Sequence, residues 1–431
     1  MKSKRHFVWE LLLPLAIALL AYTATHGALA QTDTPPATPT QVKQGMTIQD
    51  WITQIESERD AAYNQLTAGD LSDGAASLTN SLRNLPAEHP ELMDTAYGSL
   101  QLLLYTMEYL MDETVRTQFV QQHLEPEQND IDKFIIAAYN IYIGQDTPEK
   151  TVATQDLLAA AATTNPFARI GALFILSDPY FFDNADFTRQ SQEILAAEYP
   201  DLAITLEAHR YTVYGARKSG AEALTTATNA FAAKSGSTRN FAQDPVIAAS
   251  IEAAPQLNAK SEAAAISAFT RALEASQDWK ARFGLLLMIE PYGHNGHEAE
   301  VVRVCEAIAT TKSATTIATP DAVRAQLMLL KLARGQWDQT PGTPTTRPTG
   351  MQWADALLEA RWTKNPYERC LYEDVMKGLM NCAKQLDEIG KPDLAIQIYE
   401  KLAKQYPNSL VSRQCETELT RIKEGKPATR Q

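Results

Sequence analysis

Apolar residues recur at three- and four-residue steps along most of the chain, a spacing that places them on one face of a helix. The clearest example is the stretch 376–409. Gly390 divides it, because glycine adopts the left-handed conformation that ends a helix, and Pro392 stands where a second helix would begin. The two apolar stripes consist of Leu379, Cys382, Ala383, Leu386 and Ile389, then Ala395, Ile398, Tyr399, Leu402, Ala403 and Tyr406. The sequence therefore predicts a helical hairpin that Pro407 closes.

This hairpin resembles a tetratricopeptide repeat. The family pattern runs from an apolar residue through a small one and a bulky one to Ala-x-x-x-aromatic and a closing proline. It is met by Leu379, Cys382-Ala383, Leu386, Ala395-x-x-x-Tyr399 and Pro407. The sequence departs from the family at Leu379, where tryptophan is common, and at Leu402, where a small residue is usual. The resemblance covers about one repeat and implies a scaffold for protein interactions.

Helical periodicity also dominates the chain from Thr47 to Arg334. Thr47 and Asp50 predict a capping box at the start of a helix. The clearest upstream pair of helices spans 130–163, with a turn at 144–146. No segment alternates apolar and polar residues as a strand does, so we predict an all-α fold.

Two distant segments resemble each other. Asn165-Pro-Phe-Ala-Arg-Ile-Gly171 opens an apolar helix that ends at Asp178-Pro-Tyr180, and Trp279-Lys-Ala-Arg-Phe-Gly284 opens another that ends at Glu290-Pro-Tyr292. A partial third copy lies at 365–369. Repeated openings and closings predict an α-solenoid of stacked antiparallel helical hairpins, similar to a tetratricopeptide superhelix.

The N-terminal residues have the features of a secretory signal: a basic start, a short apolar run and a small-residue cleavage site at Ala28-Leu29-Ala30. The apolar run is too short for the alternative, an uncleaved membrane anchor. We expect cleavage near Ala30 and a periplasmic or extracellular protein. The predicted parts are a signal peptide (1–30), a Thr/Pro-rich linker (31–45), a degenerate hairpin solenoid (46–334), a Pro/Gly/Thr-rich loop or linker (335–350), a C-terminal helical region (351–424) and a tail (425–431).

The chain is acidic, with a formal net charge of −13. Removal of residues 1–30 takes away more basic than acidic residues, so the mature chain is more acidic still. Such a charge repels nucleic acid and anionic membrane surfaces. We predict no nucleic-acid partner and no integral membrane segment in the mature chain.

The four cysteines are too few for a disulfide framework in a chain of this length. Cys370 and Cys382 lie about 18 Å apart if they share one helix, which is too far to bridge. Cys382 and Cys415 would face each other if the helix from Leu410 stacks as the next repeat would. A disulfide between them and two buried free thiols are both open interpretations.

Candidate chemistry is sparse. His294, His297 and Glu298 could share a divalent ion, but no third distant ligand is evident, and Val301 stands where a zinc-protease helix needs histidine. A turn before a helix is the simpler interpretation. No nucleophile elbow, phosphate loop or dinucleotide fingerprint occurs, so we predict no metal and no cofactor.

Aromatic and arginine residues are the candidate partner-binding groups. Tyrosine on the inner face of a superhelix suits an extended peptide or a sugar polymer, and arginine suits a carboxylate. The alternatives are burial in the core for the tyrosines and ion pairs across a hairpin for the arginines. The candidates are Tyr139, Tyr142, Arg169, Tyr180, Tyr211, Arg282 and Tyr292.

We predict a non-catalytic scaffold or adaptor of the cell envelope or secreted space, which binds a protein or peptide partner on a concave face. Two alternatives stay open. One is an all-helical, toroid-type carbohydrate-active enzyme that uses two carboxylates, for which the sequence selects no pair. The other is a purely structural spacer.

Overall fold

The structure is a computed structural model. It describes residues 46–143, 148–179, 181–182, 185–233, 241–294, 296–310, 319–337, 347–359 and 369–426. Within these ranges it leaves out the side chains of residues 148–149, 185–187, 218–219, 230–233, 294, 369–370 and 372. The predicted signal peptide, the predicted linker and most of the third sequence copy lie outside the described residues.

All regular structure in the described residues is helical, which confirms the all-α prediction. The α-helices are α2 (Ile48–Ala68), α3 (Leu71–Arg83), α4 (Met93–Tyr105), α5 (Glu113–His123), α6 (Asp130–Ile143), α7 (Pro148–Ala161), α8 (Pro166–Leu176), α9 (Ala185–Glu198), α10 (Ala203–Ser219), α11 (Ala221–Ala233), α12 (Pro245–Asn258), α13 (Glu262–Ala275), α14 (Trp279–Ile289), α15 (Glu298–Ala309), α16 (Pro320–Arg334), α17 (Met351–Glu359), α18 (Arg369–Glu388), α19 (Pro392–Gln405) and α20 (Leu410–Lys423). Short 3-10 helices occur at η1 (Pro90–Leu92), η3 (Phe241–Gln243) and η4 (Glu290–His294), and η2 (Thr106–Leu110) is a π-helix.

Polar side chains set the helix starts that the sequence indicated. Thr47 and Asp50 form the predicted capping box, in which the Thr47 hydroxyl accepts from the Asp50 N–H at 3.2 Å and the Asp50 carboxylate accepts from the Thr47 N–H at 2.9 Å. The two similar segments begin in the same way. Asn165 caps α8 and Asp278 caps α14, each by accepting two backbone N–H groups. One part of the sequence similarity is therefore a shared helix start.

The C-terminal hairpin forms as predicted. Gly390 has φ +75° between α18 and α19, Pro392 is the first residue of α19, and that helix ends before Pro407. The predicted stripe residues Leu379, Cys382 and Tyr399 are buried. Helix α20 packs on α19 and continues the series beyond the repeat.

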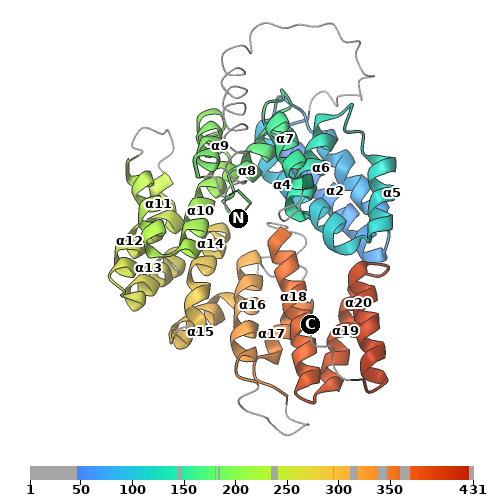
Figure 1. Cartoon of the computed structure of the whole chain (residues 1–431), viewed down its shortest axis with the longest axis vertical. Helices are drawn as coiled ribbons and strands as arrows, with labels where there is room; N and C mark the ends of the chain where they lie inside the picture. Colours follow the sequence, from blue (N-terminus) through green and yellow to red (C-terminus); the bar gives the residue numbers. More distant parts are fainter. Residues whose placement is uncertain are drawn as a thin grey trace, which may run out of the picture.

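Consecutive helices pack against each other along the chain, and the even-numbered helices make a second set of contacts. From α4 to α16, each even-numbered helix contacts the next even-numbered helix. Helix α18 then contacts α4, so this row, which we call the even-helix layer, closes on itself. Figure 1 shows the course of the chain, which runs away from α4 through α8, α10 and α14 and returns through α16 to α18.

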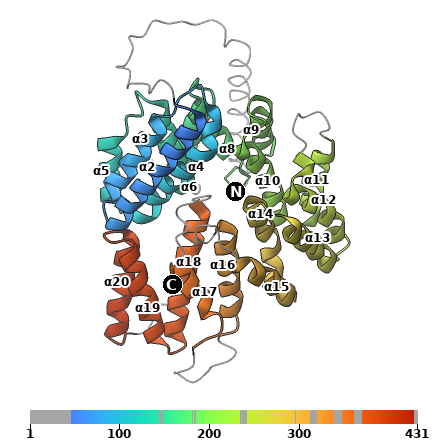
Figure 2. The same ribbon diagram turned by 180° about the vertical axis from the view of Figure 1, so that it is seen from behind.

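Contacts between the two ends of the chain make this closure. Tyr105, at the end of α4, is buried against Met376 of α18, with 3.6 Å between its hydroxyl and the sulfur, and its ring lies 6.5 Å from that of Tyr406. Arg413 of α20 donates to Asp112 at 2.7 Å. Figures 1 and 2 both place α20 beside the N-terminal helices. The first and last parts of the chain consequently share one hydrophobic core, and residues from Val213 to Leu329 form a second.

Glycines allow the close approach of helices within the even-helix layer. A Cβ atom on Gly171 of α8 would lie 2.4 Å from the ring of Phe134 on α6, and one on Gly284 of α14 would lie 2.2 Å from the hydroxyl of Tyr214 on α10. Both glycines stand two residues after the arginine in the similar segments. The second part of the sequence similarity is therefore a glycine against which an earlier helix places an aromatic ring.

The predicted loop at 335–350 connects two helices that contact each other, α16 and α17. Residues 338–346 are outside the described part. At its ends, the buried indole of Trp337 donates to the carbonyl of Thr349 at 2.9 Å, which holds the two ends of the segment together.

The possible disulfide between Cys382 and Cys415 is absent from the structure. Both residues are buried free thiols, as is Cys305. The charges of Arg334 and Asp355 act on the pKa of the Cys382 thiol on α18, whereas the charges of Glu416 and Glu418 act on the pKa of the Cys415 thiol on α20. The two thiols thus face different surroundings, with α19 packed against both of their helices. Burial raises the pKa of each to about 12, which disfavours the reactive thiolate.

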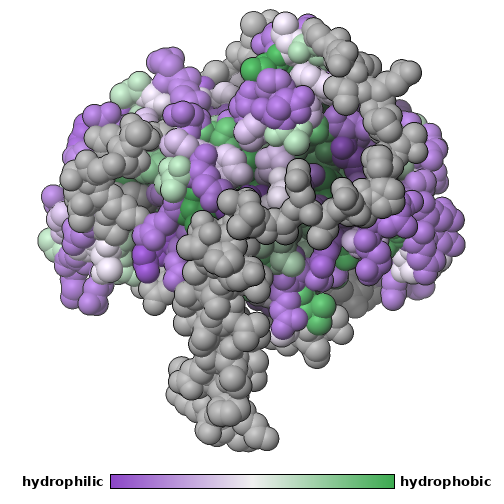
Figure 3. All heavy atoms as spheres, turned by 90° about the horizontal axis from the view of Figure 1, so that it is seen from above, coloured by the Kyte–Doolittle hydropathy of each residue, from purple (hydrophilic) through white to green (hydrophobic). Residues whose placement is uncertain are grey.

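The described surface is largely hydrophilic. In Figure 3, hydrophobic residues show as small areas among hydrophilic ones. The large hydrophobic residues that are exposed are Ile48, Ile143 and Val152. None of the described helices combines the length and the apolar character that a bilayer-spanning segment requires.

Gly284→Ala tests the packing of the even-helix layer. The added Cβ would overlap the buried end of Tyr214, so we expect the free energy of unfolding to fall by about 1–3 kcal/mol. Urea denaturation followed by circular dichroism measures it.

Gly335→Ala is the matched control. Gly335 has a helical φ of −60°, and a Cβ there would make contacts of 3.4 Å or more. We expect unchanged stability or a gain of about 0.5 kcal/mol. Equal effects of the two substitutions would contradict the proposed close approach at Gly284.

Candidate functional site

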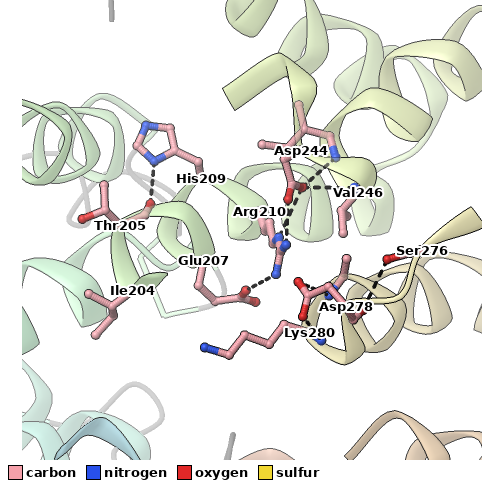
Figure 4. A network of polar contacts seen from close by, with 12 residues as sticks. Ile204, Thr205, Glu207, His209, Arg210, Asp244, Val246, Ser276, Asp278 and Lys280 are labelled. Atoms are coloured by element: carbon pink, nitrogen blue, oxygen red, sulfur yellow. Dashed lines mark hydrogen bonds and ion pairs between the residues drawn. The ribbon is translucent and has the colours of Figure 1, made fainter. Parts of the chain in front are cut away.

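Helix α10 carries polar residues on the face that meets α12 and α14. Glu207, Arg210, Tyr214 and Arg217 follow one another at steps of three and four residues, so they share one face of the helix. We call these four residues the α10 stripe. Figure 4 shows its first half, where Glu207 and Arg210 point toward the starts of α12 and α14.

Arg210 is the centre of a buried ion cluster. It donates through Nε and Nη2 to Asp244 at 3.2 and 2.6 Å, and through Nη1 to Glu207 at 3.0 Å. Asp244 also caps α12, where its Oδ1 accepts from the N–H groups of Val246 and Ile247. A single guanidinium therefore links α10 to the first turn of α12 while every charge in the cluster has a partner.

The acidity of Glu207 is altered by its place in this cluster. Burial raises the pKa of its carboxyl because the anion loses hydration, and the negative charge of Asp244 acts in the same direction, although Arg210 and Lys280 act in the opposite direction. The residue is 4% exposed. A buried carboxyl with a raised pKa is a feature of general acids, but Glu207 is enclosed and bound to Arg210, which fits a structural role better.

His209 lies beside this cluster on α10. Its ring stacks on Phe241 with 4.0 Å between centroids, and its Nδ1 lies 2.8 Å from the carbonyl of Thr205. The ring is buried and held on both sides. It helps to fix η3 against α10.

Similar arginine–carboxylate pairs connect other helices in the series. Each pair joins an arginine to an acidic side chain on another helix or at its N-cap, and in the first three the arginine presents Nε and Nη2 side by side to the carboxylate. The pairs are Arg83 with Asp132, Arg169 with Glu198, Arg210 with Asp244, Arg282 with Asp321, Arg324 with Asp374 and Arg421 with Asp387. Three of them, at Arg210, Arg282 and Arg324, join neighbours in the even-helix layer.

A second charged cluster lies where α14, α16 and α18 meet. Arg324 donates to both Glu290 and Asp374, and Lys331 donates to Glu290 at 3.0 Å. Burial alone would raise the pKa of Glu290, but Arg324 and Lys331 lower it to about 2. Glu290 is therefore a stable anion that already has two cationic partners.

The structure distributes the predicted tyrosines over separate places. Tyr139 is buried beneath the guanidinium of Arg116, and Tyr142 packs edge-on against Phe181. The ring centroid of Tyr211 lies 5.8 Å from that of Tyr214 of the α10 stripe.

Tyr292 is buried on η4, and the positive charge of Arg217 acts to lower the pKa of its hydroxyl. Tyr180 lies outside the described residues. Of the predicted tyrosines, Tyr211 and Tyr292 are therefore the two that lie near the α10 stripe.

The two predicted arginines have carboxylate partners within the chain. Arg169 binds Glu198 through two nitrogens, at 2.8 and 2.6 Å, and Arg282 binds the fully buried Asp321 at 2.6 Å. These pairs correspond to the second interpretation of the sequence, in which the arginines bind acidic neighbours.

The residues considered for a metal ion do not form a described cluster. His297 precedes α15 and lies 3.9 Å from Glu262, while Glu298 accepts from the N–H of Gly296. The side chain of His294 lies outside the described residues. Among the described residues, no group of three or more histidine, cysteine or acidic side chains is arranged to hold a metal.

A pocket lined in part by the predicted residue Arg282 lies between α13, α14 and α15. It has a volume of about 240 Å³, and its lining includes Glu274, Gln277, Arg282 and Val304. It is open to solvent on one side. The guanidinium of Arg282 in this pocket already binds Asp321, so it is not a free charge for a ligand.

Sequence reasoning missed Arg210, Arg217 and Arg324. A signal for the first two was present, because they interrupt a buried helix face that also carries Val213 and Tyr214. Charged residues at the spacing of an apolar stripe are buried with the stripe, and a buried charge needs a partner. The partners themselves, Asp244 and Asp374, are distant in sequence and could not be assigned from spacing.

Comparisons of the chain with protein-family models, with curated proteins and with solved structures found no match.

Asp321→Asn tests whether these pairs stabilise the fold. The substitution leaves the guanidinium of Arg282 without its charge partner, so we expect the free energy of unfolding to fall by about 3 kcal/mol. Chemical denaturation measures this change. The control is Glu274→Gln, which removes the exposed partner of Arg303 and should change stability by less than about 1 kcal/mol. A small effect at Asp321, equal to the control, would refute the structural role of the pair.

Glu290→Gln tests the second cluster through its pH dependence. The pKa of Glu290 is lower in the folded chain than the unfolded value of about 4.3, so its contribution is fully present above that value and is lost as the pH falls toward about 2. We expect the stability difference between the wild type and the variant to shrink from pH 6 to the lowest pH with a folded baseline. Urea titrations at several pH values measure it, and a constant difference would contradict the assignment.

Proposed function

We propose that this protein is a non-catalytic scaffold outside the cytoplasm, built as a tetratricopeptide-like superhelix of antiparallel hairpins, and that it binds a protein or peptide partner. The observation that carries the proposal is the even-helix layer. Its members are joined by arginine–carboxylate pairs and close glycine contacts, which makes a preformed and rigid framework. Such a framework binds a partner without large rearrangement.

Two features support the proposal: the arrangement of the helices and the pairing of charged side chains inside the fold. Most described buried acidic and basic side chains bind one another within or between helices. Glu207 and Asp244, the two buried carboxylates of Figure 4, both bind Arg210. This arrangement supports a framework role for the interior and leaves recognition to less buried groups. The acidic net charge of −13 favours a partner that is not itself strongly acidic overall.

One observation favours the alternative of an all-helical carbohydrate-active enzyme. The contact between α18 and α4 closes the even-helix layer, and closure is what a toroid requires. Such an enzyme also needs two accessible carboxylates about 5–10 Å apart. Glu207 has a raised pKa but is buried and bound to Arg210, so it does not meet the requirement for an accessible carboxylate.

A binding experiment with the wild type and one control variant tests the scaffold proposal. The mature chain is immobilised and exposed to envelope extract from its source cells, and retained proteins are identified and then repurified. We expect a purified retained protein to bind the wild type and Glu274→Gln equally and to protect backbone amides of the even-helix layer from hydrogen exchange. Protection confined to other surfaces, or cleavage of cell-wall glycan without any retained protein, would overturn the proposal.

A further inference from the structure

Arg217 differs from Arg83, Arg169 and Arg210 in the hydrogen bonds of its guanidinium. It lies in the last turn of α10, and its Nε and Nη1 atoms are shielded from solvent without a hydrogen-bond partner. Arg83, Arg169 and Arg210 each use Nε together with Nη2 to hold a carboxylate. The shielded Nε and Nη1 atoms of Arg217 hold no carboxylate.

Arg217 has no carboxylate of its own among the described contacts. The acidic group that acts most strongly on it is Glu290, which already binds Arg324 and Lys331. Arg324 also binds Asp374. Glu290 is therefore shared among cationic side chains and is not a dedicated partner of Arg217.

The energetic consequence is unfavourable for the isolated protein. Burial lowers the pKa of Arg217, and the positive charge of Arg324 acts in the same direction. Burying an arginine without a partner is strongly destabilising, because the guanidinium loses hydration and gains no hydrogen bond. A group that lowers the stability of the fold is expected at a binding site, where a ligand supplies the missing contacts.

The surroundings indicate which ligand would fit. The planar guanidinium fork recognises carboxylate and phosphate through paired hydrogen bonds. The single positive charge of Arg217 matches a carboxylate, whereas a phosphate dianion would leave a negative excess. Tyr214 precedes Arg217 by one turn on the α10 stripe, and Tyr292 on η4 interacts electrostatically with it. Arg217 as a whole is partly exposed although its Nε and Nη1 atoms are shielded, so a ligand has to approach them from the exposed part of the side chain.

We propose that Arg217 is a recognition site for a carboxylate group of the bound partner, either an acidic side chain or a chain terminus. This inference rests on the proposed scaffold function and names the chemistry of its ligand. Arg217 supplies donors that have no partner within the chain, and the Arg324–Glu290–Lys331 cluster holds the surrounding charge in place.

Thermal unfolding in the presence of small anions tests the site. The probes are sodium acetate and sodium phosphate, each compared with sodium chloride at constant ionic strength. For the wild type we expect a saturable rise in Tm with acetate beyond that with chloride, because a ligand that binds only the folded state stabilises it. A greater rise with phosphate than with acetate would overturn the assignment to carboxylate.

Arg217→Met and Arg210→Met separate binding from structure. Arg217→Met removes a cation that lacks a partner, so we expect its Tm without acetate to equal or exceed that of the wild type, and the acetate response to vanish. Arg210→Met leaves Glu207 and Asp244 unpaired and should lower the Tm markedly. Arg217→Lys keeps the charge but loses the fork, so its acetate response should be weaker.

Two results would overturn the inference: a Tm of Arg217→Met as low as that of Arg210→Met, or an acetate response that survives in Arg217→Met. The result of the acetate experiment is independent of the result of the partner-binding experiment that tests the scaffold proposal. If acetate acts through Arg217 while no partner protein is found, the site stands and the scaffold proposal fails. If acetate has no effect while a partner binds, the scaffold stands and this site fails.

Discussion

The structure depends on one constraint: a helical hairpin cannot bury its apolar face alone, so the next hairpin must be held at a fixed position. In the even-helix layer two kinds of contact do this. Glycines such as Gly171 and Gly284 let an aromatic ring approach the helix backbone, and arginines such as Arg210 and Arg282 reach a carboxylate at the start of a later even-numbered helix or at its N-cap. The apolar contact supplies most of the stabilisation, and the ion pair fixes which neighbour is correct.

Closure of the even-helix layer restricts how far the helices can bend and twist relative to one another. An open series bends and twists, because each repeat contacts only its neighbours. Here Tyr105 of α4, at one end of the even-helix layer, packs against Met376 of α18, at the other end, and Arg413 holds Asp112. The ends of the chain therefore restrain each other, and the interior clusters around Arg210 and Glu290 are held in nearly fixed positions. A charge without a partner, such as that of Arg217, is maintained in such a frame because the frame is too stiff to collapse around it.

The sequence was informative wherever a local rule decides the structure. The capping box at Thr47, the turn at Gly390 and the stripe that includes Tyr399 are all present, because caps and periodicity depend on neighbours within a few residues. The similar segments predicted a repeated unit, and in the structure the shared Arg and Gly of both segments make contacts between helices.

Long-range pairing could not be predicted in the same way. Nothing in the spacing relates Arg210 to Asp244, or Tyr105 to Met376, because these contacts depend on how helices far apart in sequence are placed. For the same reason the sequence left open whether Cys382 and Cys415 form a disulfide or stay free, and the structure shows both as buried free thiols. The interpretation of the tyrosines as one lined surface likewise needed spatial positions, and the structure places Tyr139 and Tyr292 in different parts of the fold.

The closure between the two ends of the chain is the central claim, and zero-length cross-linking tests it directly. A carbodiimide joins a carboxylate to an amine only when they are in contact, so the Arg413→Lys chain should form an intramolecular bond between Asp112 and the new amine in the monomer. The Arg169→Lys chain, cross-linked to Glu198 on the following helix, is the positive control. Cross-linking in the control together with no intramolecular product at Asp112 would contradict the closed arrangement.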